Sequence, residues 1–153
     1  MKTEKRKNDL KSESGQSLVE LSIAMILLLT IFAGVVDLGR IFFHFIEMRD
    51  AAEEAMIYGS AFPTHCDQIV ERAHSGLIDP TNIAVTVTMD GVACASATMA
   101  ANACTGNEIR VEIEDPNFPI TMPFLGMILG RQTISLNADI SGTILRPACT
   151  AGP

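Results

Sequence analysis

One acidic residue inside an apolar segment is the position best suited to a specific ionic contact. Glu20 lies in the run LVELSIAMILLLTIFAGVV, residues 18–36, and Gly15 stands five positions before it. A carboxylate at the centre of a membrane costs about 2.5–3.5 kcal/mol, and less near an end, so it needs a partner. If the chain is cut after Gly15, the new α-amino group of Gln16 supplies one, because Glu20 of one subunit can pair with the amine of its neighbour. The alternative is that Glu20 reaches the headgroup layer and has no further role.

The cysteines form a second chemically significant set: Cys66, Cys94, Cys104 and Cys149. Four cysteines allow three disulfide pairings. We expect Cys94 to pair with Cys104, closing the loop between them, and Cys66 to pair with Cys149, tying the tail to the end of the long helix. Each bond would stabilise the fold by about 2–4 kcal/mol.

No pattern in the sequence indicates catalysis. His65, Cys66 and His74 raise a metal site as an alternative to disulfides, but no C-x-x-C or H-x3-H spacing supports it. There is no P-loop, no G-x-G-x-x-G and no nucleophile motif. We therefore expect no enzymatic activity, no metal and no cofactor.

Length and charge narrow the class further. The 153 residues support one modest domain. With 18 acidic and 11 basic residues, the net charge is -7. A nucleic-acid-binding protein needs a clustered basic face, so this class is excluded.

The apolar run is long enough to cross a bilayer. A helix of this length spans about 28 Å, close to the roughly 30 Å hydrocarbon core. The run has no polar stripe, and so small a chain has little else with which to cover it. The sequence therefore predicts a transmembrane helix over residues 18–36.

The flanking charges predict its orientation. Residues 1–15 contain five basic and three acidic residues, whereas residues 37–54 contain five acidic residues and two arginines. The positive-inside rule places the N-terminus in the cytoplasm and the remainder outside. A secretory signal is the competing interpretation, but residues 30–35 lack the small-residue pattern of a cleavage site.

The helical pattern continues beyond the run. Apolar residues recur at spacings of three and four from residue 38 to residue 59, while Arg40, His44, Glu47 and Glu54 lie on the other side. We predict one helix from about Ser17 to Ala61, with Gly59 weakening its last turn and Pro63 ending it.

The remaining sequence predicts a small head. A short helix is expected over residues 67–75, and period-two alternation predicts strands over 82–89, 108–114 and 132–145. Each strand has one polar face, as in an antiparallel sheet. Residues 91–107 are expected to form a loop too long for a tight hairpin.

The expected fold class is therefore α+β. It combines a long N-terminal helix, transmembrane in one half and an amphipathic stalk in the other, with a three-stranded antiparallel β head. The expected division is a cleaved basic leader over 1–15, the helix over 16–62 and the extracytoplasmic head over 63–153.

Three segments resemble the TadE-like family: GQSLVELS at 15–22, GVVDLGRIF at 34–42 and DAAEEA at 50–55. Its members are minor pilins or pseudopilins of the Tad (Flp) type IVb pilus machinery. The resemblance covers about residues 14–61, and the later Pro123–Gly126 segment is a weak match. Leu21 departs from the family, whose members often carry Phe or Tyr there, which leaves the subfamily open.

The resemblance implies cleavage after Gly15 by an aspartic prepilin peptidase, with Glu20 as the fifth residue of the mature chain. It implies the peptidase, other pilin or pseudopilin subunits and membrane lipid as partners, and no nucleic acid. The implied location is the bacterial cytoplasmic (inner) membrane, with incorporation into a pilus as a further step. The alternative is an uncleaved single-pass protein whose extracytoplasmic head binds a ligand or an envelope partner.

Asp37 and Arg40 lie three positions apart, just beyond the apolar run. The family motif contains both, which implies a role in assembly. The residues alone predict an exposed pair that contributes only about 0.2–0.5 kcal/mol.

Overall fold

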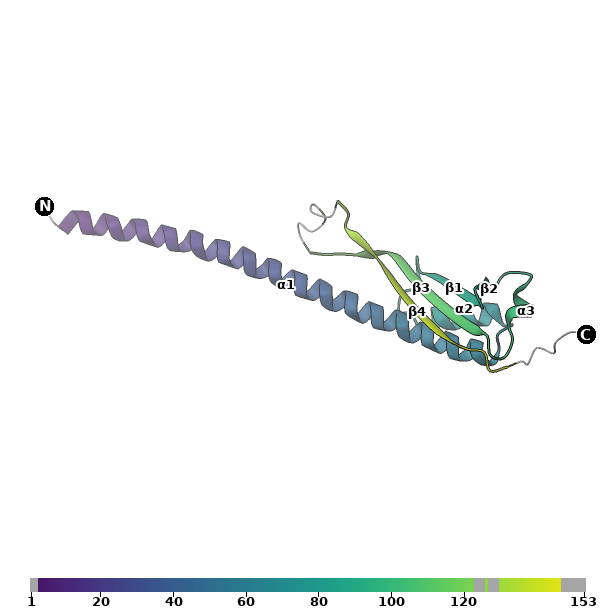
Figure 1. The fold of residues 1–153 in the computed structure, drawn as a ribbon. Coiled ribbons are helices and arrows are strands. Elements are labelled where there is room, and N and C mark those ends of the chain that lie inside the picture. Colours follow the sequence, from purple (N-terminus) through teal and green to yellow (C-terminus); the bar gives the residue numbers. More distant parts are fainter. Residues whose placement is uncertain (1–2, 123–125, 127–129, 147–153) are drawn as a thin grey trace, which may run out of the picture.

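The computed structural model describes residues 3–122, 126 and 130–146, with side chains from residue 15 onward. The predicted α+β class is confirmed, since a long helix leads into a small head that contains a sheet (Figure 1). The described elements, in chain order, are α1 (Thr3–Ala61), α2 (Cys66–Ser75), β1 (Ala84–Met89), β2 (Val92–Ala93), α3 (Met99–Asn102), β3 (Glu108–Pro119) and β4 (Thr133–Thr143).

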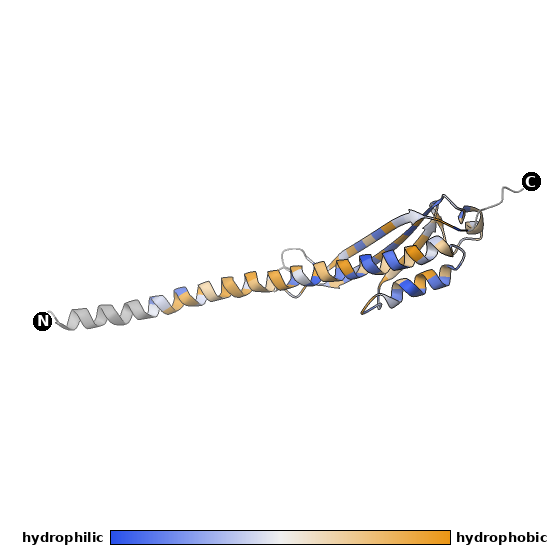
Figure 2. Cartoon of the chain, turned by 90° about the horizontal axis from the view of Figure 1, so that it is seen from below, coloured by the Kyte–Doolittle hydropathy of each residue, from blue (hydrophilic) through white to orange (hydrophobic). Residues whose placement is uncertain are grey.

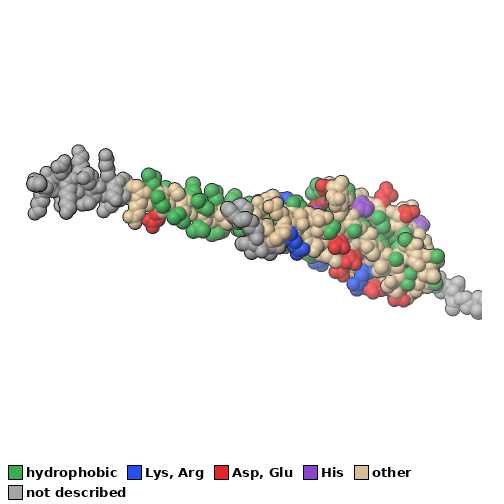
Figure 3. All heavy atoms as spheres, turned by 90° about the horizontal axis from the view of Figure 1, so that it is seen from above, with side chains coloured by type: hydrophobic (Ala, Val, Ile, Leu, Met, Phe, Trp, Pro, Cys, Tyr) green, Lys and Arg blue, Asp and Glu red, His purple; other side chains and the backbone are tan. Residues whose placement is uncertain are grey.

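Helix α1 is 59 residues long and projects far beyond the head (Figure 1). It begins at Thr3, so the predicted start near Ser17 was wrong. No proline interrupts residues 3–16, and Gly15 alone does not break the helix. Its predicted end at Ala61 is confirmed. The projecting part is predominantly hydrophobic (Figures 2 and 3).

The sheet has the strand order β2-β1-β3-β4, with all neighbours antiparallel. The three predicted strands are present, and β2 adds a fourth. Asp90 and Gly91 both have positive φ angles, 49° and 76°, which produces a tight turn between β1 and β2. The prediction of one loop over 91–107 was wrong, because this segment contains both β2 and α3. Strand β3 runs on to Pro119 through an irregularity between Asp115 and Phe118.

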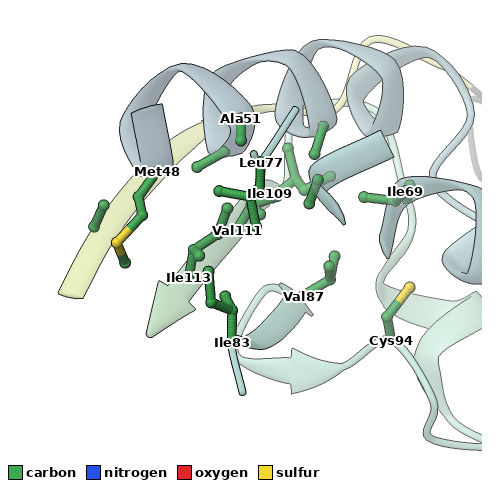
Figure 4. Close-up of a cluster of buried hydrophobic side chains, with 14 of the residues drawn as sticks. Met48, Ala51, Ile69, Leu77, Ile83, Val87, Cys94, Ile109, Val111 and Ile113 are labelled. Atoms are coloured by element: carbon green, nitrogen blue, oxygen red, sulfur yellow. The ribbon is translucent and has the colours of Figure 1, made fainter. Parts of the chain in front are cut away.

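The core lies between the sheet and the last third of α1 (Figure 4). Helix α1 packs against β3 and β4, and α2 packs against α1 and β1. The fully buried side chains include Met48, Ala52 and Ala55 of α1, Ile69 and Ala73 of α2, Met89 of β1, and Ile109, Val111 and Ile113 of β3. The small alanines let the helix lie close to the strands.

Gly59 allows a close approach between α1 and the rest of the head. A Cβ atom there would lie 2.4 Å from Ile109 Cδ1 and 3.0 Å from Ile69 Cδ1. The helix continues regularly to Ala61, so Gly59 is a packing position within the helix rather than a weak last turn.

Candidate functional site

The apolar part of α1 is the most exposed hydrophobic surface of the described chain. Among the described residues, α1 is the helix long and apolar enough to cross a membrane, by length and composition. Its most apolar 18-residue window has a mean hydropathy of 2.5, and none of it is buried by the rest of the chain. Leu18 and Ile31 illustrate this, with 65% and 68% of their surface exposed. An apolar surface of this extent needs lipid or other protein around it.

Hydroxyl groups within this surface are satisfied by the helix itself. Ser22 Oγ donates to the Leu18 carbonyl and Thr30 Oγ1 to the Ile26 carbonyl, each at 2.8 Å. Bonds to the preceding turn leave no free hydroxyl donor toward lipid. Ser22 and Thr30 are therefore compatible with a hydrocarbon environment.

Gly15, Gln16 and Glu20 all lie on the exposed N-terminal part of α1. Gln16 and Glu20 are one helical turn apart, and within the described residues the head does not cover either of them. The carboxylate of Glu20 is thus presented outward, at the beginning of the apolar run. This arrangement can bind a positively charged group from another molecule.

Asp37 and Arg40 lie at the other end of the run, and here the prediction of an exposed pair was wrong. Asp37 is only 5% exposed. Its Oδ2 atom accepts a hydrogen bond from the backbone N–H of Thr121 at 2.9 Å, and the carboxylate also accepts bonds from Thr121 Oγ1 and the Met122 N–H. Arg40 lies 3.4 Å from the same carboxylate and donates to Thr121 Oγ1 at 3.4 Å. We call this set of four residues the Asp37 contact.

The hairpin between β3 and β4 supplies the partners of Asp37. The Ile120 N–H donates to the Gln132 carbonyl at 2.9 Å, which closes the base of the hairpin and directs Thr121 toward α1. Burial raises the pKa of Asp37, but the hydrogen bonds from Thr121 and Met122, aided by Arg40, outweigh this effect. The pKa of Asp37 is therefore lowered from its usual value of 3.8, and the carboxylate is charged at neutral pH.

His44 joins α1 to β3 one to two turns further along. Its Nε2 atom lies 3.0 Å from Asp115 Oδ2, its Nδ1 atom lies 3.6 Å from Glu47 Oε2, and its ring stacks on Phe118 with centroids 4.9 Å apart. The sequence pattern placed His44 and Glu47 on a solvent face, which was wrong, since their side chains are only 15% and 18% exposed. These residues border a cavity of about 330 Å³ that also adjoins Asp79.

Two ionisable contacts border the cavity: His44 with Asp115 joins α1 to β3, and His44 with Glu47 lies within α1. Across the described residues, no group of three or more His, Cys, Asp or Glu side chains is placed to hold a metal ion.

The disulfide pairing predicted from the sequence was wrong. Cys66, at the start of α2, is bonded to Cys94, with 5.7 Å between their Cα atoms. The tight turn before β2 reverses the chain, and the Cys94 N–H donates to the Val87 carbonyl at 2.8 Å, which places Cys94 beside α2. Cys104 is also disulfide-bonded. Cys149, like residues 123–125 of the weak family match, lies outside the described residues.

The arrangement defines a class: a single apolar helix, able to anchor the chain in a membrane, that carries an α+β head. The family model described as TadE-like protein matches residues 15–56, and the predicted resemblance is therefore confirmed for this segment. The match includes Gly15, Glu20 and the Asp37–Arg40 pair, and it extends into the part of α1 that forms the core. Comparison with curated proteins and with solved structures finds no match for the chain.

Three contacts could not be found by reading the sequence. Thr121 and Met122 carry no motif, and they lie 84 and 85 positions from Asp37. Asp115 is likewise separated from His44 by 71 positions. The Asp90–Gly91 pair, by contrast, is a turn signal that could have predicted the β1–β2 hairpin.

Proposed function

We propose that this chain is a pilin-like structural and assembly subunit of a Tad (Flp) type IVb pilus or a related secretion apparatus, processed by a prepilin peptidase after Gly15. One observation carries the proposal. Within the TadE-like segment, the exposed apolar run over residues 18–36 contains one carboxylate, Glu20, near its start. The proposed role is structural rather than enzymatic.

The exposed apolar helix can hold the subunit in the membrane before assembly and can pack against other subunits during assembly. In the bilayer, lipid covers residues 18–36, so the subunit is stable as a single-pass protein of the cytoplasmic membrane. Leaving the bilayer exposes this surface, and packing against the helices of other subunits must then replace lipid. A subunit of this kind therefore enters a helical bundle rather than water.

Glu20 gives that bundle a register. Cleavage after Gly15 creates an ammonium group at Gln16, one turn from Glu20 of the same chain. In a bundle of staggered helices, Glu20 of one subunit pairs with the ammonium group of the next. Apolar surroundings make an unpaired charge costly, so the pair selects one stagger over the others.

The disulfide supports an extracytoplasmic head. Disulfides form and persist in oxidising compartments and are rare in the bacterial cytoplasm. The Cys66–Cys94 bond and the basic leader both favour a cytoplasmic N-terminus with the head on the opposite side.

An uncleaved membrane-anchored binding protein is the second candidate. The cavity bordered by His44 and Asp115 favours it, because about 330 Å³ is at the lower end of the size of small-molecule sites. This protein would keep its leader and would not need Glu20.

The decisive experiment measures the intact mass and the N-terminal sequence of the protein from cells that express its cognate prepilin peptidase. We expect a new terminus at Gln16. A Gly15→Val variant should retain the leader, and Gly39→Ala, at another glycine of α1, should be processed normally. An intact Met1 terminus in the presence of active peptidase would overturn the proposal in favour of the second candidate.

Assembly is tested separately with Glu20→Ala. We expect this variant to be inserted in the membrane and cleaved, but to be missing from the sheared pilus or secretion-apparatus fraction. Glu53→Ala removes an exposed carboxylate from the stalk part of α1 and should assemble normally. Equal assembly of the two variants would contradict the role of Glu20.

A further inference from the structure

The hairpin between β3 and β4 reaches the end of the apolar run of α1. Thr121 and Met122 contact Asp37, the first residue beyond the run. Met122 Sδ also lies 3.4 Å from the position of a Cβ atom at Gly34, which is inside the run. This end of the head is therefore level with the point where α1 leaves the hydrocarbon core.

Apolar side chains are exposed at the same level of α1. Leu38, Phe42 and Phe43 have 67%, 60% and 73% of their surface exposed. Leu38, Phe42 and Phe43 have their Cα atoms about 3, 9 and 10 Å beyond Val36 along the helix axis, and helical side chains lean toward the N-terminus, which brings the two rings back toward the core. The headgroup layer is about 5–8 Å thick on each side of the core. Phe and Leu side chains of interfacial helices bury their apolar surface at the boundary between headgroups and acyl chains.

Basic side chains accompany these apolar ones. Arg40 and Arg131 are both exposed, whereas the nearby carboxylate of Asp37 is buried. The sequence from Met122 to Gly130 contains no charged residue. Acidic side chains are concentrated instead over the head, further from the apolar part of α1 (Figure 3). This end of an acidic molecule is thus the one suited to contact phosphate groups.

The Asp37 contact satisfies two backbone N–H groups at the end of the hairpin that lies nearest the apolar run. Backbone N–H groups outside regular structure are costly at membrane depth unless they are hydrogen-bonded. Asp37 accepts bonds from the N–H groups of Thr121 and Met122, and Arg40 balances the charge of the carboxylate.

We propose that this end of the head docks on the outer surface of the bilayer, with Leu38 and Met122 next to the hydrocarbon core, Phe42 and Phe43 at the outer edge of the headgroup layer, and Arg40 and Arg131 facing phosphate headgroups. The inference rests on the membrane-spanning part of the proposed function. It does not depend on cleavage or on assembly into a pilus.

The distribution of the side chains around α1 favours lipid over a second helix. At about 100° per residue, Phe42 and Phe43 lie about 100° from each other and both point away from Asp37, and their ring centroids are 6.2 Å apart. Met122 lies on the Asp37 side. A neighbouring helix would cover one of these directions, whereas a bilayer surrounds the chain in all of them.

The full chain contains no tryptophan, so single-tryptophan variants report on chosen positions. Phe43→Trp and Met122→Trp are reconstituted in phosphatidylcholine and phosphatidylglycerol vesicles that contain lipids brominated at different depths. Val35→Trp reports on the span, and Leu145→Trp, which is exposed near the end of α1, is the remote control.

We expect lipids brominated at a shallow depth to quench tryptophan at positions 43 and 122, and the emission from both positions to lie at shorter wavelength than in water. Lipids brominated at a deep position should quench tryptophan at position 35. Tryptophan at position 145 should not be quenched. Quenching at 35 alone would overturn the docking but leave the span. No quenching at 35 would overturn both. A blue shift at 43 that depends on the protein-to-lipid ratio, without quenching by bromine, would identify a second copy as the partner and overturn the proposal.

The Asp37 contact is tested in the Met122→Trp background. We expect Asp37→Ala to lose the shallow quenching of position 122, because the hairpin is released from α1. Asp79→Ala removes a carboxylate that holds the Thr81 turn of the head and should retain the quenching. Circular dichroism and the intact Cys66–Cys94 bond verify folding. Undiminished quenching in a folded Asp37→Ala variant would overturn the role of Asp37 in holding the hairpin at the lipid.

Discussion

The carboxylate of Asp37 accepts a hydrogen bond of 2.9 Å from the backbone N–H of Thr121, 84 positions later in the chain. This bond attaches the β3–β4 hairpin to α1 where the apolar run ends. The head is thus joined to α1 through the core around Met48 to Gly59, through the contact of His44 with Asp115 and through the Asp37 contact. These separate attachments fix the direction in which the head extends along the helix.

Removing the Asp37 carboxylate should release the hairpin while the core persists. A hydrogen bond to a charged group contributes about 1.5–3 kcal/mol, which corresponds to roughly 10- to 150-fold in an opening equilibrium. We expect the amides of Thr121 and Met122 to exchange faster by this factor in Asp37→Ala, as measured by hydrogen–deuterium exchange in detergent. Arg40→Ala should have a smaller effect, because its contact with Asp37 is partly exposed and contributes about 0–1 kcal/mol. Equal effects of the two variants would contradict this account.

Acidification should release the same hairpin. The pKa of Asp37 is lowered in the folded state, so the stability that Asp37 contributes is fully present above its unfolded pKa. This contribution is lost as the pH falls through the folded pKa, which lies below 3.8. We expect exchange of the Thr121 and Met122 amides, corrected for intrinsic rates, to be constant near neutral pH and to rise only in this acidic range. Asp37→Asn should remove the transition, and an unchanged profile in that variant would assign the transition to another carboxyl group.

Gly59 should be intolerant of even one added carbon. In Gly59→Ala, the new Cβ atom meets Ile109 and Ile69, both fully buried, and the packing must rearrange. Overpacking of this kind costs about 1–3 kcal/mol. Gly39→Ala is the matched control, since a Cβ atom at Gly39 has nothing within 4 Å. Denaturant unfolding in detergent should show a lower free energy of unfolding for Gly59→Ala, and equal values would refute the close approach.

The Cys66–Cys94 bond can be verified by cleavage after methionine. Met89 and Met99 separate Cys66, Cys94 and Cys104 into different peptides. Without reduction, the peptide over 57–89 should remain linked to the peptide over 90–99. A link between the peptides over 90–99 and 100–122 would contradict the structure. Loss of the bond in Cys66→Ala/Cys94→Ala should lower the free energy of unfolding by about 2–4 kcal/mol.

Local patterns in the sequence were sufficient to predict most of the elements. Spacings of three and four residues predicted the end of α1 at Ala61, and alternation predicted β1, β3 and β4. These features depend on neighbours along the chain. Strand β2 is only two residues long, too short to show alternation, although Asp90–Gly91 signals the turn before it.

The functional contacts were predicted less completely, because they depend on how distant segments pack. The roles proposed for Gly15 and Glu20 rest on their spacing along one helix, which can be read from the sequence. The burial of Asp37 depends on Thr121, and the choice of Cys94 as the partner of Cys66 depends on the β1–β2 turn. The charges and spacings along α1 alone could therefore predict neither the burial of Asp37 nor the pairing of Cys66 with Cys94.

The TadE-like match ends at residue 56, and the core lies on both sides of this boundary. Met48, Ala52 and Ala55 come from the matched segment, whereas Ile109 and Ile113 come from the unmatched head. A fragment that begins after Pro63 would therefore expose one wall of its own interior to water. Exchange of heads between related anchors, in evolution or in the laboratory, would succeed only if residues 48–59 were inherited together with the head.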